Sequence, residues 1–136
     1  MTDQGILDTS TVVLLSRLDA ELLPDEPLIT TVTLAELSVG PLVARTGKER
    51  SSRQAVLQQA EADFEPLPFD AQAARAFGRV AASLRSAGHK VQARGYDAMI
   101  AATAIANDLP LYSVNPGDFS GIDGLDLRPI PHPDQQ

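Results

Sequence analysis

Four acidic residues of this 136-residue chain lie after short apolar runs or in the first turn of a predicted helix, and they are candidate metal ligands. Carboxylates that lie a few ångströms apart repel one another, so a protein keeps them together only where a cation offsets the repulsion. Oxygen-only ligands favour Mg²⁺ or Mn²⁺ over Zn²⁺. Mg²⁺ held by a few carboxylates leaves room for water and phosphate oxygens, an arrangement that hydrolyses phosphodiesters. The candidates are Asp8 in ILDTS, Glu36 in TVTLAEL, Asp97 in RGYDAMIAATA and Asp118 in SVNPGDF.

Each of these acids also has a purely structural explanation. Asp8 could cap the helix that follows it. Thr33 and Glu36 have the spacing of a capping box, and Asp97 could interact with the N-terminus of its own helix. Residues 115–118 have the composition of a turn. All four acids nevertheless follow predicted strands on one rim of a sheet, and this shared position favours a common site.

The order of apolar runs and helical patterns predicts how the acids are positioned. Short β-prone runs alternate with longer segments of helical periodicity. This alternation predicts an α/β domain with a mostly parallel central sheet, whose working site lies beyond the carboxyl ends of the strands. The predicted strands are residues 5–7, 27–32, 65–69, 109–114 and 125–130. The predicted helices are residues 9–22, 33–41, 49–64, 71–87 and 96–107.

Length and composition predict one soluble domain. A chain with 43% hydrophobic residues can form a single core, which we expect to span residues 1–131, followed by a flexible tail at 132–136. No apolar run approaches the roughly 20 residues of a membrane span, and the start of the chain lacks the basic residues of a secretory signal. We therefore expect a cytoplasmic protein that does not enter a membrane. Because there is no cysteine, any metal must be held by oxygen ligands or by His89 and His132.

The formal net charge of −7 argues against a general nucleic-acid coat protein. The charge is unevenly distributed, however. Residues 45–94 contain nine basic and five acidic residues, whereas the rest of the chain contains two basic and thirteen acidic ones. A basic band of this kind could steer a polyanion toward an acidic pocket, and it is equally typical of ordinary solvated helices.

The segments ILDTS, TLAEL, RGYDAMIAATA and SVNPGDF, in this order and spacing, resemble the four signature segments of PIN domains. The match covers nearly the whole chain, and the strings ELSVGP and DAMIAATAIAN resemble those of the VapC ribonuclease toxins. The resemblance implies a PIN-like three-layer sandwich, with a mostly parallel central sheet flanked by helices. It also implies that the catalytic, metal-binding acids are Asp8, Glu36 and Asp97, with Asp118 as a more variable fourth.

The resemblance further implies supporting roles for three residues. Ser10 and Asn115 would assist by hydrogen bonding to a ligand carboxylate or to a bound water. Arg94, three residues before Asp97, matches a position that is often basic in these toxins and would assist with the substrate. Val114 departs from the pattern, because many relatives carry a polar or basic residue before the asparagine. This departure bears on local substrate contacts and not on the metal site.

The activity implied by the resemblance is that of an endoribonuclease that depends on Mg²⁺, with Mn²⁺ able to substitute. Such an enzyme cleaves single-stranded or structured RNA as the toxin of a toxin–antitoxin pair. The implied partners are a cognate antitoxin, whose tail crosses the active-site groove and often places an arginine among the acids, and a second copy of the chain. An apolar stripe at residues 80–84 could form a groove for a partner, but such a stripe is also typical of a helix packed in the core.

Other classes of protein share parts of this pattern. A phosphoacceptor receiver domain needs paired acids beside its strand-end aspartate and a lysine after a later strand, and this chain has neither. A haloacid-dehalogenase-type phosphatase needs an aspartate where this chain has Ser10. Two alternatives stay open: a PIN-fold RNA-processing nuclease without an antitoxin, and a catalytically inactive PIN-like binding module. The second would have little reason to keep four converging acids.

Overall fold

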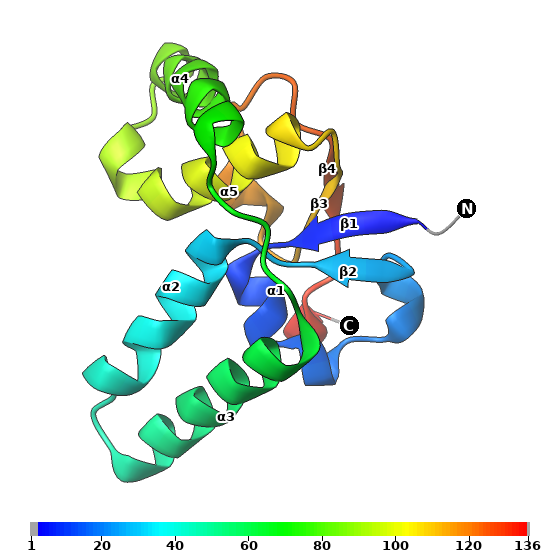
Figure 1. Ribbon diagram of the computed structural model, residues 1–136, viewed down its shortest axis with the longest axis vertical. Helices are drawn as coiled ribbons and strands as arrows, with labels where there is room; N and C mark the ends of the chain where they lie inside the picture. Colours follow the sequence, from blue (N-terminus) through cyan, green and yellow to red (C-terminus); the bar gives the residue numbers. More distant parts are fainter. Residues whose placement is uncertain (1–2, 136) are drawn as a thin grey trace.

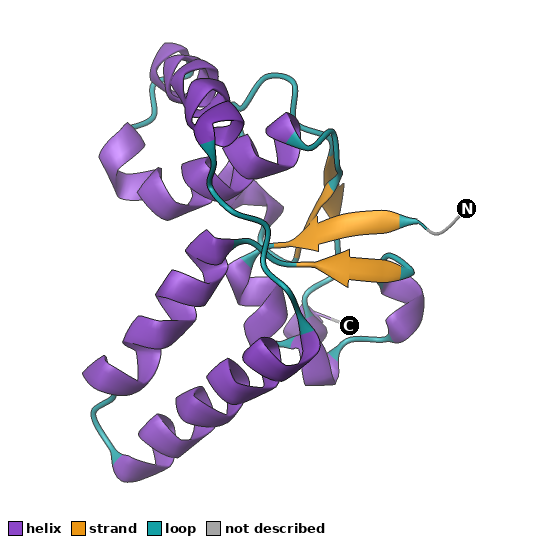
Figure 2. Cartoon of the chain, viewed as in Figure 1, coloured by secondary structure: helices purple, strands orange, loops and turns teal. Residues whose placement is uncertain are grey.

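In the residues that the computed structural model describes, 3–135, the centre of the molecule is a sheet of four parallel strands (Figures 1 and 2). Strand β1 (Gln4–Leu7) lies between β2 (Glu26–Leu28) and β3 (Leu111–Ser113), and β4 (Leu127–Pro129) pairs with the other side of β3. Each neighbouring pair is parallel. The carboxyl ends of the strands therefore meet at one edge of the sheet.

Helices cover both faces of this sheet, which confirms the predicted α/β sandwich (Figure 2). Because successive strand residues point to opposite faces, Ile6 packs against α5 and its neighbour Leu7 packs on the side of α1 and α3. The helices are α1 (Thr9–Val13), α2 (Thr31–Val39), α3 (Gly47–Asp63), α4 (Ala71–Ser86) and α5 (Gly95–Ala106).

Helix α4 packs on the outer side of α5. Ala76, Val80 and Leu84 are at most 1% exposed and form one cluster with Ala98 and Ala102 of α5. The small side chains of α5 allow this close approach. The apolar stripe at residues 80–84 is therefore core, and its interpretation as a partner groove is wrong.

The beginning of α2 differs from the prediction. Strand β2 ends at Leu28, and α2 begins at Thr31 because the Thr30 hydroxyl accepts a hydrogen bond of 3.2 Å from the backbone N–H of Thr33. The predicted strand at residues 65–69 is reduced to a single bridge between Thr30 and Leu67. Local sequence favoured β structure here, but the cap and the contact with Leu67 decide the boundary.

The helix predicted for residues 9–22 is also interrupted. After α1, the chain forms two 3₁₀ turns, Leu15–Arg17 and Ala20–Leu22. The Asp19 carboxylate accepts a hydrogen bond from the backbone N–H of Glu21, a local bond that competes with continuous helix. The leucines of this segment still pack against the core cluster around Leu7.

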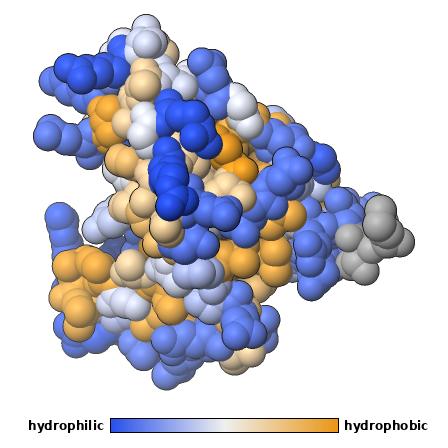
Figure 3. Space-filling model, turned by 45° about the horizontal axis from the view of Figure 1, so that its top comes forward, coloured by the Kyte–Doolittle hydropathy of each residue, from blue (hydrophilic) through white to orange (hydrophobic). Residues whose placement is uncertain are grey.

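Helices α2 and α3 form a hairpin that projects from the sheet (Figure 1). The Arg53 side chain donates a hydrogen bond of 2.9 Å to the carbonyl of Gly40 and ties the two helices together near the turn. Val39, Leu42 and Val43 are 48%, 83% and 61% exposed at this turn. Figure 3 shows hydrophobic surface at the end of the hairpin. This apolar end is available to a protein partner.

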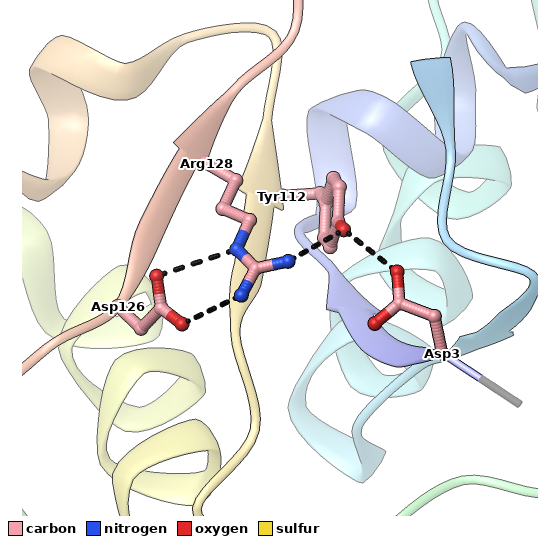
Figure 4. Close-up of polar contacts among 4 residues, drawn as sticks. All are labelled: Asp3, Tyr112, Asp126 and Arg128. Carbon is pink, nitrogen blue, oxygen red and sulfur yellow. Dashed lines mark hydrogen bonds and ion pairs between the residues drawn. The ribbon is translucent and has the colours of Figure 1, made fainter. Parts of the chain in front are cut away.

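A chain of polar contacts that does not involve the four candidate metal ligands crosses the sheet (Figure 4). The Tyr112 hydroxyl donates to Asp3 at 3.4 Å and accepts from Arg128 at 3.2 Å, and the Arg128 guanidinium also pairs with Asp126. The Tyr112 ring lies over Gly5, where an added Cβ would be 2.4 Å from a ring carbon. Glycine at this position therefore allows the ring to reach across β1.

The last described residues, Pro133–Gln135, form a 3₁₀ turn, in which Asp134 pairs with Arg17 at 2.5 Å. The boundary of the domain at residue 131 and the flexibility of residues 132–136 stay predictions, and Gln136 lies outside the described residues. Within residues 3–135, every helix is too short or too polar to cross a bilayer.

Candidate metal centre

Asp8 lies directly beyond the carboxyl end of β1 and is 2% exposed. It caps α1, because its Oδ1 accepts hydrogen bonds from the backbone N–H and the hydroxyl of Thr11. Its Oδ2 accepts from the hydroxyls of Ser10 at 3.0 Å and Ser113 at 2.7 Å. The prediction that Asp8 caps the following helix is therefore confirmed. Capping does not exclude a role as a metal ligand, since these bonds fix the carboxylate at the sheet edge.

Sequence reasoning missed Thr11 and Ser113 as partners of Asp8. Ser113, the last residue of β3, is fully buried, and its Oγ also accepts from the backbone N–H of Asn115 at 2.9 Å. The Thr11 hydroxyl accepts from the backbone N–H of Val114 at 3.1 Å. The two hydroxyls join the end of β1 to the end of β3. The available signal was that hydroxyl residues lie close to the predicted strand ends. For Ser113 this signal could not identify the partner, because Asp8 is 105 positions away in the sequence.

Glu36 lies in the second turn of α2 and not in its first turn. The capping-box explanation is wrong, because Thr30 caps the helix and Glu36 bonds elsewhere. The Thr9 hydroxyl donates a hydrogen bond of 2.6 Å to Oε1 of Glu36 and lies 3.0 Å from the hydroxyl of Thr33. Burial raises the pKa of Glu36, the hydrogen bond from Thr9 lowers it, and the charge of Asp8 raises it.

Asp97 is the third residue of α5, and none of the described residues donates a hydrogen bond to its carboxylate. Arg94 occupies the N-cap position without a side-chain cap, so Asp97 does not cap the helix by hydrogen bonding. The pKa of Asp97 is raised to about 7, mainly by burial and further by the charges of Asp118, Glu36 and Asp8, while Arg94 lowers it. The charges of the other three acids therefore act on Asp97.

Asp118 is exposed in the 3₁₀ turn Pro116–Phe119 that follows β3. Arg94 lies beside this turn, and its Nη1 donates hydrogen bonds to the backbone carbonyls of Gly117 at 3.3 Å and Asp118 at 3.1 Å. The turn predicted for residues 115–118 is confirmed. The long side chain of Arg94 connects it to the beginning of α5.

Two further sequence expectations concern the segment before Asp118. The Asn115 side chain is exposed, and the contact with the Asp8 network comes from its backbone N–H. The Val114 side chain is 4% exposed and belongs to the core cluster around Leu7. The Val114 side chain is therefore part of the core, and its backbone N–H contacts Thr11.

The donor chemistry of the site fits a hard divalent cation such as Mg²⁺. The candidate ligands are all carboxylate oxygens, and Asp97 has a free carboxylate beside the others. Among the described residues, no three carboxylates are already close enough to form a ready-made metal site. Hydroxyl groups hold the carboxylates of Asp8 and Glu36 in position.

An open cleft of about 530 Å³ lies beside these acids. It is lined by Glu36 of α2 and by the 3₁₀ turn Val91–Arg94 together with the first turns of α5. Its size is in the range of about 300–1,000 Å³ that is typical of ligand sites. The cleft gives a bound molecule access to Asp97 from solvent.

The chain matches a family model and two curated proteins. A model described as "PIN domain" matches residues 6–125. Ribonuclease VapC5 of Mycobacterium tuberculosis is 41% identical over 123 residues, which are 88% of this chain and 88% of that protein. Ribonuclease VapC of Rickettsia bellii is 26% identical over 130 residues, which are 93% of this chain and 96% of that protein.

Solved structures show the same fold. VapBC-5 from Mycobacterium tuberculosis, a member of the VapBC family of toxin–antitoxin systems, contains a chain that matches with a TM-score of 0.80 and 37% identity. The match covers 93% of this chain and 98% of that chain. A chain of DNA-bound VapBC from Salmonella typhimurium matches with a TM-score of 0.70 and 26% identity, covering 93% of this chain and 97% of that chain.

Proposed function

The chain belongs to the PIN-domain family, as its four sequence segments indicated, and we propose that it is a Mg²⁺-dependent endoribonuclease. The observation that carries the proposal is that Glu36 of α2 and the half-buried Asp97 of α5 line one open cleft, where the charges of Asp8 and Asp118 also act on Asp97. The names of the relatives, both ribonucleases, support the substrate class.

Each acid has a distinct part in this proposal. Asp8 and Asp97 would hold the metal, Asp8 in a position fixed by hydroxyl groups and Asp97 with a carboxylate to which no described residue donates a hydrogen bond. Glu36 and Asp118 complete the ligand set from α2 and from the turn after β3. When bound, Mg²⁺ supplies Lewis acidity to the phosphodiester and lowers the pKa of a water. Ser10 supports Asp8, and Asn115 supports it through Ser113.

RNA approaches through the cleft beside Asp97. Lys90 is exposed next to the 3₁₀ turn Val91–Arg94 that lines this cleft, and Arg94 lies at its end. Cations at this edge attract phosphates and offset the overall negative charge of the protein. Mn²⁺ substitutes for Mg²⁺, because it accepts the same oxygen ligands in similar geometry.

The cellular role that we propose is that of a toxin held inactive by a cognate antitoxin in the cytoplasm. The structural relatives from toxin–antitoxin complexes support this role. The exposed apolar end of the α2–α3 hairpin supports a protein partner, either an antitoxin or the second copy in a homodimer. Expression of the chain alone should arrest growth, and Asp97→Asn should relieve the arrest at equal soluble protein.

Incubation of the purified protein with a mixed RNA pool, in Mg²⁺ or in EDTA, tests the activity directly. Mapping of 5′ ends should give reproducible cuts that disappear in EDTA and in Asp97→Asn. Asp123→Asn is the matched control, because Asp123 is an exposed loop aspartate outside the acidic site, and it should cut like wild type. Metal-independent cuts, or equal cutting by Asp97→Asn, would remove this site from the activity.

The same experiment separates the alternatives. A catalytically inactive binding module would bind RNA without new 5′ ends. A PIN-fold RNA-processing nuclease would cut RNA without arresting growth and without a protein that inhibits it.

A further inference from the structure

Tyr96 is an unusual surface residue, because its side chain is 53% exposed directly beside Asp97. Among the residues that the structure describes, no other aromatic side chain is exposed to this extent. None of the described residues hydrogen-bonds its hydroxyl. Packing within the fold therefore does not explain why an aromatic side chain lies at this exposed position.

The position of Tyr96 connects it with the proposed chemistry. It lies in the first turn of α5 and lines the same cleft as Glu36, Arg94 and Asp97. The exposed amide side chain of Gln92, which can donate and accept hydrogen bonds, lines this cleft as well. A flat aromatic face, an amide and two of the proposed metal ligands, Glu36 and Asp97, thus share one open cavity.

Single-stranded RNA offers a group that fits this combination. Its bases are unstacked and can be splayed onto aromatic side chains, while their edges accept and donate hydrogen bonds. A tyrosine ring has two χ angles and loses little conformational entropy when a base stacks on it. Duplex RNA would not present a free base face to the ring.

We propose that Tyr96 forms a nucleobase-stacking subsite for a nucleotide next to the scissile phosphate, with Gln92 at the edge of the base. This inference rests on the proposed ribonuclease function. It adds that the RNA substrate must be unpaired at the nucleotide that Tyr96 binds. Stacking of one base on an aromatic side chain contributes about 1–3 kcal/mol, which corresponds to about 5- to 150-fold in affinity.

A double-mutant design tests the contact between ring and base. The substrate is a short single-stranded RNA that contains a cut mapped with the wild-type protein, together with a series in which one nucleotide at a time is abasic. For the wild type, loss of the base at one position near the cut should raise KM by about 5- to 150-fold. Tyr96→Ala should raise KM for the intact RNA by a similar factor, and the abasic nucleotide should then add nothing.

The controls keep the result specific. Tyr96→Phe keeps the ring and should preserve KM, whereas Tyr96→Leu keeps apolar bulk without the ring and should behave like Tyr96→Ala. Asp123→Asn changes an exposed loop residue outside the cleft and should leave KM unchanged. The kcat values should stay close to wild type, because stacking acts equally on bound substrate and transition state.

Several outcomes would overturn the inference. An unchanged KM for Tyr96→Ala, or an abasic penalty as large in the variant as in wild type, would show that the ring does not stack on a base. An unchanged KM with weakened binding to an antitoxin or to a second copy would assign Tyr96 to a protein interface. Absence of any cleavage by the wild type would instead refute the ribonuclease function, and the subsite with it.

Discussion

The guanidinium of Arg94 and the backbone of Asp118 are joined by a hydrogen bond of 3.1 Å across 24 positions of the chain. A second bond from the same Nη1 reaches Gly117. The bonds connect the beginning of α5, which carries Asp97, to the turn that carries Asp118. Arg94 therefore fixes the distance between two candidate metal ligands, in addition to bringing a positive charge to the cleft.

We predict that Arg94→Ala weakens the response of the protein to metal as well as RNA cleavage. Without the two bonds the turn at residues 116–119 is less ordered, and Asp118 contributes less to Mg²⁺ binding. The increase of Tm with Mg²⁺ concentration, followed by a thermal-shift titration, should move to higher concentration than in wild type. A normal Mg²⁺ response with weakened RNA binding would show that Arg94 acts only on the phosphate.

Thr9 should be needed to orient Glu36. Its hydroxyl lies within hydrogen-bond distance of Glu36 and of the Thr33 hydroxyl, and its bond to Glu36 lowers the pKa of that carboxyl. Thr9→Val removes a hydrogen bond to a charged group, worth about 1.5–3 kcal/mol, and should lower kcat/KM by roughly one order of magnitude. Thr9→Ser keeps the hydroxyl and should cleave RNA nearly as wild type. A loss in Thr9→Ser with none in Thr9→Val would point to packing of the methyl group instead.

The stability of Asp97→Asn should distinguish a shared metal site from the alternative that the acids only stabilise separate helix ends. Neutralising Asp97 removes repulsion, so the Tm of the variant in EDTA should equal or exceed that of wild type. Free Mg²⁺ at a hundredfold over its Kd should stabilise the wild type by about 2.7 kcal/mol and the variant much less. An equal metal response of the two proteins would exclude Asp97 from the site.

The metal-free protein should lose stability as pH rises from about 4 to about 7. The pKa of Asp97 is raised to about 7 in the folded protein, so the folded state binds more protons than the unfolded state in this window. Full stability from this group is present below its unfolded pKa and is lost as pH rises through the folded value. Urea unfolding in EDTA should show a slope of at most about 1.4 kcal/mol per pH unit. Asp97→Asn should flatten the slope, and an unchanged slope would contradict the assignment.

Gly5→Ala should destabilise the fold by about 1–3 kcal/mol, because the new methyl group would collide with the Tyr112 ring and approach Pro24. Displacing the ring also disturbs the bonds to Asp3 and Arg128. Gly78→Ala is the matched control, since a Cβ there meets no atom within 4 Å and alanine favours the helix. Urea unfolding should give opposite signs for the two changes, and a stable Gly5→Ala protein would show that the ring moves freely.

The sequence by itself determined the fold class, and it also proposed the set of acids. Alternation of β-prone runs with helical periods requires a parallel sheet, and the carboxyl ends of its strands must then meet at one edge. Asp8 and Asp118 follow from this rule, whereas Asp97 opens a helix that no strand directly precedes and was indicated by the family motif. The order of four short motifs was enough to indicate the PIN-domain family, although each motif has an ordinary structural explanation.

Only the tertiary structure decided how the acids are held. Ser113 reaches Asp8 across 105 positions, Thr9 reaches Glu36 across 27, and Arg94 reaches Asp118 across 24. The first turn of α2 and the burial of Val80 and Leu84 also depend on contacts with distant segments. Local propensity describes what a segment prefers when alone, whereas hydrogen bonds between segments far apart in sequence exist only after the sheet has brought its strand ends together.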